Sequence, residues 1–133
     1  MQEIRWIQRF ENFQKALNNF HETTNCIKKN GINKIYTMAL IQAFEIVFEL
    51  SWKTTKDYLE YNGIKTDTPR ETIKEAFSKN IIEDGQTWIE MMEARNKTSH
   101  TYREDFAQTL VSEILNSYSP LLDKLFLFLE GKI

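Results

Sequence analysis

The run of polar and charged residues from Arg95 to Tyr102 carries the side chains of this sequence that are best suited to chemistry. The guanidinium of Arg95 offers a charged fork that matches phosphate oxygens and the negative charge that builds in a phosphoryl transition state. Histidine is the most common general acid or base in enzymes, so His100 could take a proton from a ribose hydroxyl or give one to a leaving oxygen. Asn96 could orient either group. These residue types together suit the cleavage of a phosphodiester without a metal ion.

The spacing of Arg95 and His100 leaves two interpretations open. In a continuous helix, residues five apart lie roughly 140° apart around the axis and do not share a face. Thr101 and Glu104 have the spacing of a capping box, which predicts a helix break and a helix–helix junction where the two side chains can converge. The plainer alternative is that Arg95 and His100 only satisfy carbonyls and carboxylates at a helix end. Spacing alone favours this plainer alternative.

Other kinds of functional site have little support in the sequence. It contains no Cys–His pattern with metal-ligand spacing, no glycine-rich phosphate loop and no Gly-x-Ser-x-Gly elbow. We therefore expect no metal and no cofactor. A net charge of -2 argues against a protein that coats nucleic acid. An enzyme that acts on one phosphodiester needs only a local basic cluster, so this acidity does not exclude nucleic-acid chemistry.

The length of 133 residues suits a single domain that spans residues 1–133. The single cysteine, Cys26, cannot form an internal disulfide, which suits a reducing cytosol. No apolar run approaches the ~20 residues of a membrane span, and the N-terminus lacks the apolar stretch of a signal peptide. The sequence therefore predicts a cytoplasmic protein with no membrane partner.

The elements that must position the polar run are expected to be helices, because no stretch alternates with period two. A second helix should run from about Lys34 to Tyr61, and it is apolar over more than one face, so we expect it to be the central, most buried element. A first helix, ending at Asn30-Gly31, is indicated by apolar residues at steps of three and four: Ile4, Ile7, Phe10, Phe13 or Gln14, Leu17, Phe20 and Ile27.

Three further helices are expected. A short third helix opens at Thr68-Pro69-Arg70-Glu71, where Thr and Glu have capping-box spacing, and ends near Asn80. A fourth spans about 84–95, and a last helix spans about 101–129 with Pro120 expected to kink or interrupt it. The predicted fold is all-α, an antiparallel up-and-down helical bundle of four long helices plus one short helix.

Together with its flanking blocks, this polar run resembles the HEPN superfamily of small helical proteins. The defining motif of that superfamily is an Arg, a polar residue that is often Asn, a few more residues and a His, and Arg95-Asn96-x-x-x-His100 matches it. The chain is most similar to the branch of nucleotidyltransferase substrate-binding proteins, which are encoded beside a minimal nucleotidyltransferase. The blocks that carry the resemblance cover nearly the whole chain: Phe44-Glu45-x-x-Phe48-Glu49-Leu50-x-Trp52-Lys53-x-x-Lys56-Asp57-Tyr58-Leu59, Pro69-Arg70-Glu71 with Glu75-Ala76-Phe77, Asp84-Gly85-x-x-Trp88, and Met92-Glu93-x-Arg95-Asn96-x-Thr98-Ser99-His100-Thr101-Tyr102.

The resemblance implies a homodimer in which the Arg–His segments of two chains face one cleft. In HEPN toxins this cleft is a metal-independent endoribonuclease site, where Arg95, Asn96 and His100 would have the roles described above. The partner nucleotidyltransferase, acting as antitoxin, attaches AMP to a tyrosine two residues past the His, and Tyr102 occupies that position. The added bulk and negative charge would exclude an RNA phosphate. Without the resemblance, Tyr102 would be interpreted as a partly buried packing residue.

The family name implies a second role, that of a non-catalytic subunit that binds nucleotide or another substrate for the nucleotidyltransferase. A third alternative is a helical interaction protein whose polar junction only serves dimer packing. These roles share the same residues, so the sequence leaves them open.

The remaining charged candidates have two interpretations. Glu45, Glu49 and Lys53 lie at steps of four on one helix face, where they could form intrahelical ion pairs or line the cleft and orient Arg95 and His100. We favour the ion pairs. Because the chain is acidic, the basic character of the cleft must be local. The residues that could provide it or line the cleft are Arg95, Lys97, Ser99 and Arg103 of each chain.

Overall fold

The computed structural model describes residues 2–133, apart from the side chain of Gln2, and every regular element among these residues is helical. This confirms the predicted all-α fold. A 3₁₀ turn, Thr98–His100 (η1), joins α4 to α5, and a π-helical turn, Ile114–Tyr118 (η2), joins α5 to α6. The helices are α1 Gln2–Asn30, α2 Lys34–Tyr61, α3 Pro69–Ser78, α4 Gly85–Asn96, α5 Glu104–Glu113 and α6 Ser119–Glu130.

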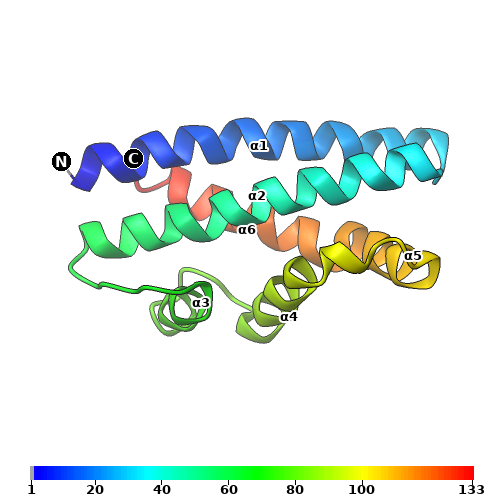
Figure 1. Ribbon diagram of the computed structural model, residues 1–133. Helices are drawn as coiled ribbons and strands as arrows, with labels where there is room; N and C mark the ends of the chain where they lie inside the picture. Colours follow the sequence, from blue (N-terminus) through cyan, green and yellow to red (C-terminus); the bar gives the residue numbers. More distant parts are fainter. Residues whose placement is uncertain (1) are drawn as a thin grey trace.

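Helices α1 and α2 form a long antiparallel pair that dominates the fold (Figure 1). The apolar stripe of α1 begins at Trp6, which is 1 % exposed, and not at Ile4, which is 58 % exposed. Ile4 lies six residues before the buried Phe10, so the two side chains point roughly 120° apart around the helix axis. Trp6 lies four residues before Phe10, so these two side chains share the buried face of α1. The Trp6 ring packs edge-on against Tyr58 of α2 with centroids 5.0 Å apart.

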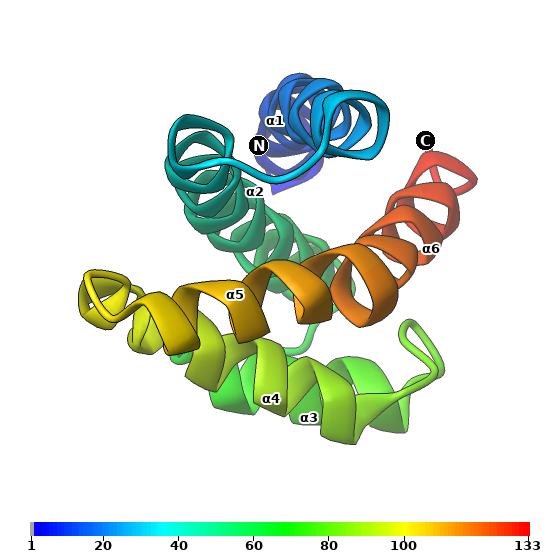
Figure 2. The same ribbon diagram turned by 90° about the vertical axis from the view of Figure 1, so that its right-hand side faces the viewer.

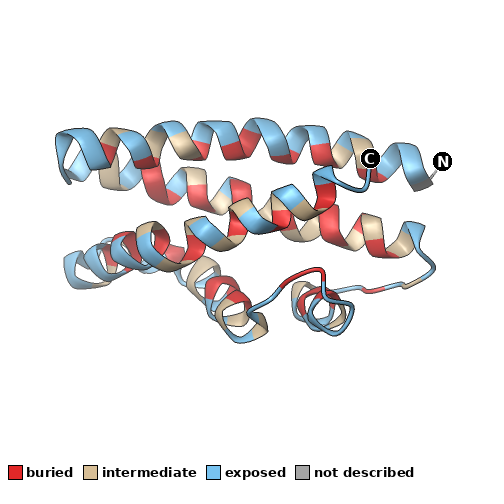
Figure 3. Cartoon of the chain, turned by 180° about the vertical axis from the view of Figure 1, so that it is seen from behind, coloured by how far each residue is buried: buried red, intermediate tan, exposed pale blue. Residues whose placement is uncertain are grey.

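The central position predicted for α2 is confirmed, because α2 packs against α1 and against α3, α4, α5 and α6 (Figures 1 and 2). Figure 3 shows the buried residues on the inner faces of the helices and exposed residues on the outer face of α1. The N-terminal half of α2 nevertheless exposes several large apolar side chains. Ile35, Met38 and Ile46 are 76 %, 63 % and 48 % exposed. We call these three side chains the α2 apolar patch.

By length and composition, α2 is apolar enough to cross a membrane, which corrects the expectation that no segment would approach such a span. A core helix of a globular protein passes the same test. Because α2 is packed against the other helices of the fold, this property is weak evidence for a membrane.

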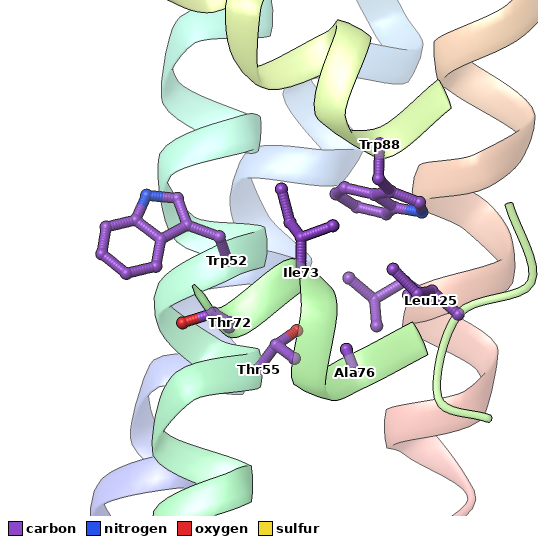
Figure 4. Close-up of a pocket in the computed structure, with 8 residues that line it drawn as sticks. Trp52, Thr55, Thr72, Ile73, Ala76, Trp88 and Leu125 are labelled. Carbon is purple, nitrogen blue, oxygen red and sulfur yellow. The ribbon is translucent and has the colours of Figure 1, made fainter. Parts of the chain in front are cut away.

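Thr68 and Glu71 cap the start of α3, and Glu71 accepts from a different backbone N–H than the capping box predicts. Thr68 accepts a hydrogen bond from the Glu71 N–H at 3.2 Å, and Pro69 occupies the first turn. The Glu71 carboxylate accepts from the N–H of Asp67 at 3.1 Å instead of closing the box on Thr68. Figure 4 shows where α3 meets its neighbours, with Trp52 of α2 and Trp88 of α4 on either side of Ile73. The gap left there is about 10 Å³, room for about one water molecule.

Pro120 interrupts the last helix as predicted, and the structure shows how. The π turn lies directly before it, and the Ser119 N–H donates to the carbonyl of Ile114, five residues back. Pro120 lacks an N–H and its ring crowds the preceding turn, so the wider π turn relieves the clash. The chain changes direction between α5 and α6 (Figure 2). Tyr118 of this turn is buried and stacks on Phe44 of α2, with centroids 5.7 Å apart.

Candidate functional site

The Arg95–Tyr102 segment lies at the junction of α4 and α5, where the regular helix gives way to tight turns. Asp84 fixes the start of α4, because its carboxylate accepts from the Thr87 N–H at 3.0 Å and from the Thr87 hydroxyl at 2.7 Å. These hydrogen bonds lower the pKa of Asp84. At the other end, α4 stops at Asn96, and the His100 N–H donates to the Lys97 carbonyl at 2.9 Å. The predicted helix break is therefore present.

The capping box predicted at Thr101 is wrong. Helix α5 begins at Glu104, and Arg103 precedes it without a side-chain cap. The Thr101 hydroxyl instead donates to the carbonyl of Thr98 at 2.9 Å. The Thr101 hydroxyl is therefore bonded within the 3₁₀ turn and does not cap a helix. The chain makes one more turn before α5 starts at Glu104.

Arg95 is held against α2 by two side chains. Its Nη1 lies 3.4 Å from Oε2 of Glu45, and the Thr98 hydroxyl donates to the same Glu45 oxygen at 2.6 Å. Arg95 Nη1 also lies 3.4 Å from the Thr98 hydroxyl oxygen. Thr98 is only 6 % exposed, whereas the side chains of Arg95 and Glu45 are 31 % and 33 % exposed. The guanidinium therefore lies at the surface while its hydrogen-bonding partner Thr98 lies beneath it.

The inner part of the Arg95 guanidinium is enclosed. Its Nε atom is buried and has no hydrogen-bond partner among the described residues. Nη1 is engaged by Glu45 and Thr98, as given above. Nη2 makes no hydrogen bond in the described part of the chain and is not among its buried polar atoms. One nitrogen of the guanidinium is thus available for an external acceptor.

His100 and Tyr102 are both exposed at the end of the 3₁₀ turn. Their rings meet edge to face, with centroids 6.2 Å apart and planes at 65°. The imidazole makes no hydrogen bond to the residues that the structure describes. Tyr102 is 79 % exposed, so the interpretation of a partly buried packing residue is wrong. The reason is that the turn after His100 directs Tyr102 and Arg103 away from the core.

The other charged candidates are less closely tied to Arg95. Lys53 and Glu49 form an intrahelical pair at 3.4 Å, and Glu49 also accepts from the Trp52 indole N–H at 3.2 Å. The pair interpretation therefore fits these two residues, whereas Glu45 contacts Arg95.

The basic cluster is partly neutralised within the chain. Arg103 lies 3.4 Å from Asp105, and both side chains are well exposed, so this contact contributes little stability. Asn96 at the end of α4 is exposed, and so are Lys97 and Ser99 in the turns that follow. Of the three predicted cations, only Lys97 has no carboxylate within ion-pair distance among the described residues.

Thr98 was not among the predicted site residues, although it makes the shortest side-chain contact in the segment. Residues three apart are neighbours on the surface of a helix, so the position of Thr98 three residues after Arg95 is the signal that could have identified it. The sequence does not show that Glu45, 53 residues away, supplies the acceptor.

The described residues contain no group of three or more His, Cys, Asp or Glu side chains placed to hold a metal ion. A second cavity, of about 100 Å³, lies between α4, α6 and the 80–83 link and is lined by Trp88, Leu121 and Phe128 among others. Residues of the Arg95–Tyr102 segment line neither cavity. His100 and Tyr102 are exposed, so these two side chains of the candidate site lie on the surface of the chain.

Comparison with known proteins gives a family match over almost the whole chain. The family model described as nucleotidyltransferase substrate binding protein like matches residues 8–131. A Haemophilus influenzae protein described as probable ribonuclease HepT is 35 % identical over 79 residues, which cover 56 % of this chain and 54 % of that protein. The chain thus aligns with about half the length of this relative.

Two solved structures share the fold. A protein from Thermus thermophilus is 28 % identical, with a TM-score of 0.77 over 85 % of this chain and 94 % of its own. A Haemophilus influenzae protein, described as revealing the fold of a substrate binding domain of a nucleotidyltransferase, is 24 % identical with a TM-score of 0.78. That match covers 91 % of this chain and 98 % of the other, and it bears on the fold alone.

Proposed function

This chain belongs to the nucleotidyltransferase substrate binding protein like family, and from that premise we propose that it is a HEPN-type toxin, a metal-independent endoribonuclease that works as a cytoplasmic homodimer. The observation that carries the proposal is that a half-buried Arg95 and an exposed His100 lie on the same junction between α4 and α5. A relative described as a probable ribonuclease supports the same reaction class. Its partner in the cell would be a cognate minimal nucleotidyltransferase that acts as antitoxin.

In the proposed reaction His100 transfers protons and Arg95 binds the phosphate. One imidazole takes the proton of a ribose 2′-hydroxyl, and the 2′ oxygen attacks the adjacent phosphorus. The bond from phosphorus to the 5′ oxygen breaks, and that oxygen receives a proton. The products are a 2′,3′-cyclic phosphate and a 5′-hydroxyl. The free nitrogen of Arg95 would bind a non-bridging oxygen as its charge grows, and Asn96 would orient the phosphate.

A homodimer supplies the second proton-transfer group. One imidazole cannot act as base and acid in the same step, and each chain has one histidine in this segment. We propose that His100 of the partner subunit is the other group. The α2 apolar patch supports self-association, because its exposed side chains lie on the same helix as Glu45, the residue that contacts Arg95. Exposed apolar side chains that gather on one element are typical of an interaction surface.

Tyr102 is the proposed acceptor of AMP. The nucleotidyltransferase would catalyse attack of the phenol oxygen on the α-phosphorus of ATP, with release of the phenol proton and pyrophosphate. Tyr102 is 79 % exposed, so its oxygen is accessible to a second protein. Its ring lies edge-on to His100, so an attached phosphate would place negative charge where the RNA phosphate must bind.

The second candidate function is a non-catalytic subunit that binds a nucleotide or another substrate for the nucleotidyltransferase. The family description favours it, and so does the carboxylate of Glu45, which already neutralises part of the Arg95 charge. In this role Arg95 would bind a phosphate group without subsequent bond cleavage.

RNA cleavage in a chelator separates the two functions. We expect wild type to cleave RNA and both Arg95→Ala and His100→Ala to lose at least about 100-fold in rate. Arg70→Ala and His21→Ala are matched controls that remove the same residue types outside the segment, and they should keep the wild-type rate. Cleavage that survives both site substitutions would refute the proposed site. No cleavage by unmodified wild type would favour the binding subunit.

A further inference from the structure

We infer that Glu45 and Thr98 are positioning residues that hold one nitrogen of Arg95 and leave another free for phosphate, a role whose catalytic consequence rests on the proposed function. Glu45 is on α2 and Thr98 on the 3₁₀ turn. Arg95 therefore contacts one residue of the central helix α2 and one residue of the turn that follows its own helix.

The contacts converge on a single carboxylate oxygen. Oε2 of Glu45 lies 2.6 Å from the Thr98 hydroxyl and 3.4 Å from Arg95 Nη1. The Thr98 hydroxyl also lies 2.9 Å from the Arg95 carbonyl, but it has one hydrogen to give. Its shorter contact, to the charged acceptor, is the stronger hydrogen bond. The lone pairs of Thr98 then face Arg95 Nη1, so the same hydroxyl ties Arg95 to Glu45.

Burial distinguishes this arrangement from an ordinary surface ion pair. Thr98 is 6 % exposed and Arg95 Nε is fully buried, so water does not replace these contacts easily. An exposed pair such as Arg103–Asp105 has no comparable partner beneath it. The buried hydroxyl restricts where the guanidinium plane can lie.

The arrangement leaves the arginine with capacity to bind. Glu45 contacts Nη1 only, at 3.4 Å, which is longer than a charge-assisted hydrogen bond of the bidentate kind. Nη2 is free, as described above. Glu45 therefore orients Arg95 through Nη1 and leaves Nη2 for a phosphate oxygen.

Loss of this positioning should lower the catalytic rate more than it weakens substrate binding. A displaced guanidinium can still attract RNA by its charge, but it no longer meets the transition state in the right place. A misplacement of about 1 Å can cost as much as about 100-fold in rate. We therefore expect kcat to fall between about tenfold and about 100-fold for Thr98→Val and for Glu45→Ala, with little change in KM.

Conservative variants separate positioning from folding. Thr98→Val keeps the shape and removes the hydroxyl, whereas Thr98→Ser keeps the hydroxyl and should restore most of the rate. Glu45→Gln keeps an accepting oxygen and should lose less than Glu45→Ala. Glu22→Gln, on the exposed face of α1, removes the same charge elsewhere and should match wild type. Thr98→Val and Glu45→Ala activities that both equal wild type would overturn the inference.

Hydrogen exchange at the Arg95 Nε–H, followed by ¹H–¹⁵N NMR, tests the inference independently of RNA cleavage. The buried Nε–H should exchange slowly in wild type and in Thr98→Ser, and at least about tenfold faster in Thr98→Val and Glu45→Ala. Equal exchange in all four proteins would overturn the positioning role. If wild type shows the slow Nε–H but cleaves no RNA, the proposed function fails while the positioning of Arg95 stands. If Thr98→Val does not fold, Glu45→Ala against Glu45→Gln makes the same test.

Discussion

Tyr118 lies in the π turn between α5 and α6, and its burial gives a quantitative prediction about alkaline stability. The residue is 4 % exposed and stacks on Phe44. Burial, with smaller contributions from the charges of Glu113, Glu90 and Glu93, raises the pKa of Tyr118 to about 12 from 10.0. The phenol therefore keeps its proton in the folded chain at pH values where the unfolded chain loses it.

The sign and size of the effect follow from this difference. Because the folded state binds the proton more tightly, the stabilisation is fully present below pH 10 and is lost as pH rises through 12. A pKa of about 12 against 10.0 corresponds to at most about 2.7 kcal/mol. The three glutamates lie at the surface and are screened by water, so their smaller contributions are reduced and we expect less than this upper figure. Burial is the largest cause, so added salt should leave most of the effect.

Tyr118→Phe removes the ionising group and keeps the ring on Phe44. Urea unfolding of wild type and Tyr118→Phe, followed by circular dichroism from pH 7 to pH 12, measures the difference in unfolding free energy. At pH 7 the two proteins should agree within about 0.5 kcal/mol, because the described residues offer the hydroxyl no hydrogen bond. Above pH 10 wild type should lose about 1 to 2.7 kcal/mol relative to the variant. A difference that stays constant across this range would refute the reasoning.

Three further predictions concern the site and the helices that position it. Co-expression with the nucleotidyltransferase should add one adenylate mass to wild type and none to Tyr102→Phe, and equal addition to both would contradict the assignment. Asp84→Ala should lower the unfolding free energy by about 1 kcal/mol through loss of the α4 cap. Hydrogen bonds from Thr87 lower the pKa of Asp84, so this stabilisation should be present above the pKa of Asp84 in the unfolded chain and lost as pH falls through its pKa in the folded chain. Asp84→Asn should lack this pH dependence. Ile46→Glu should give a monomer in analytical ultracentrifugation and little RNA cleavage, whereas a dimer with the wild-type rate would remove the α2 apolar patch from the proposed interface.

The arrangement of helices followed from local patterns in the sequence, and the errors arose where two patterns competed. Thr68 and Pro69 predicted the start of α3 because their chemistry acts within one turn. Thr101 carried the same capping signal, but its hydroxyl bonds to Thr98, a choice set by the preceding 3₁₀ turn. Ile4 and Trp6 are both apolar residues of the first turns of α1, and the step of four to Phe10 places Trp6 and not Ile4 on the face that packs against α2.

The candidate site was less accessible to sequence reasoning, because its contacts cross between elements. Arg95 and His100 were found from their residue types and from the family resemblance. That Glu45, rather than Glu49, contacts Arg95 depends on how α4 lies against α2, which no spacing within α2 reveals. The exposure of Tyr102 likewise depends on the turn after His100, since an aromatic side chain alone suggests burial.

The chemical identity of the RNA ends is the measurement that tests the proposed ribonuclease most directly. A short RNA incubated with purified wild type in chelator, and then analysed by mass spectrometry, should give fragments with a 2′,3′-cyclic phosphate and a 5′-hydroxyl. The same incubation with His100→Ala should leave the RNA intact. Fragments with 5′-phosphate and 3′-hydroxyl ends, or intact RNA with the unmodified wild type, would contradict the proposed role of Arg95 and His100.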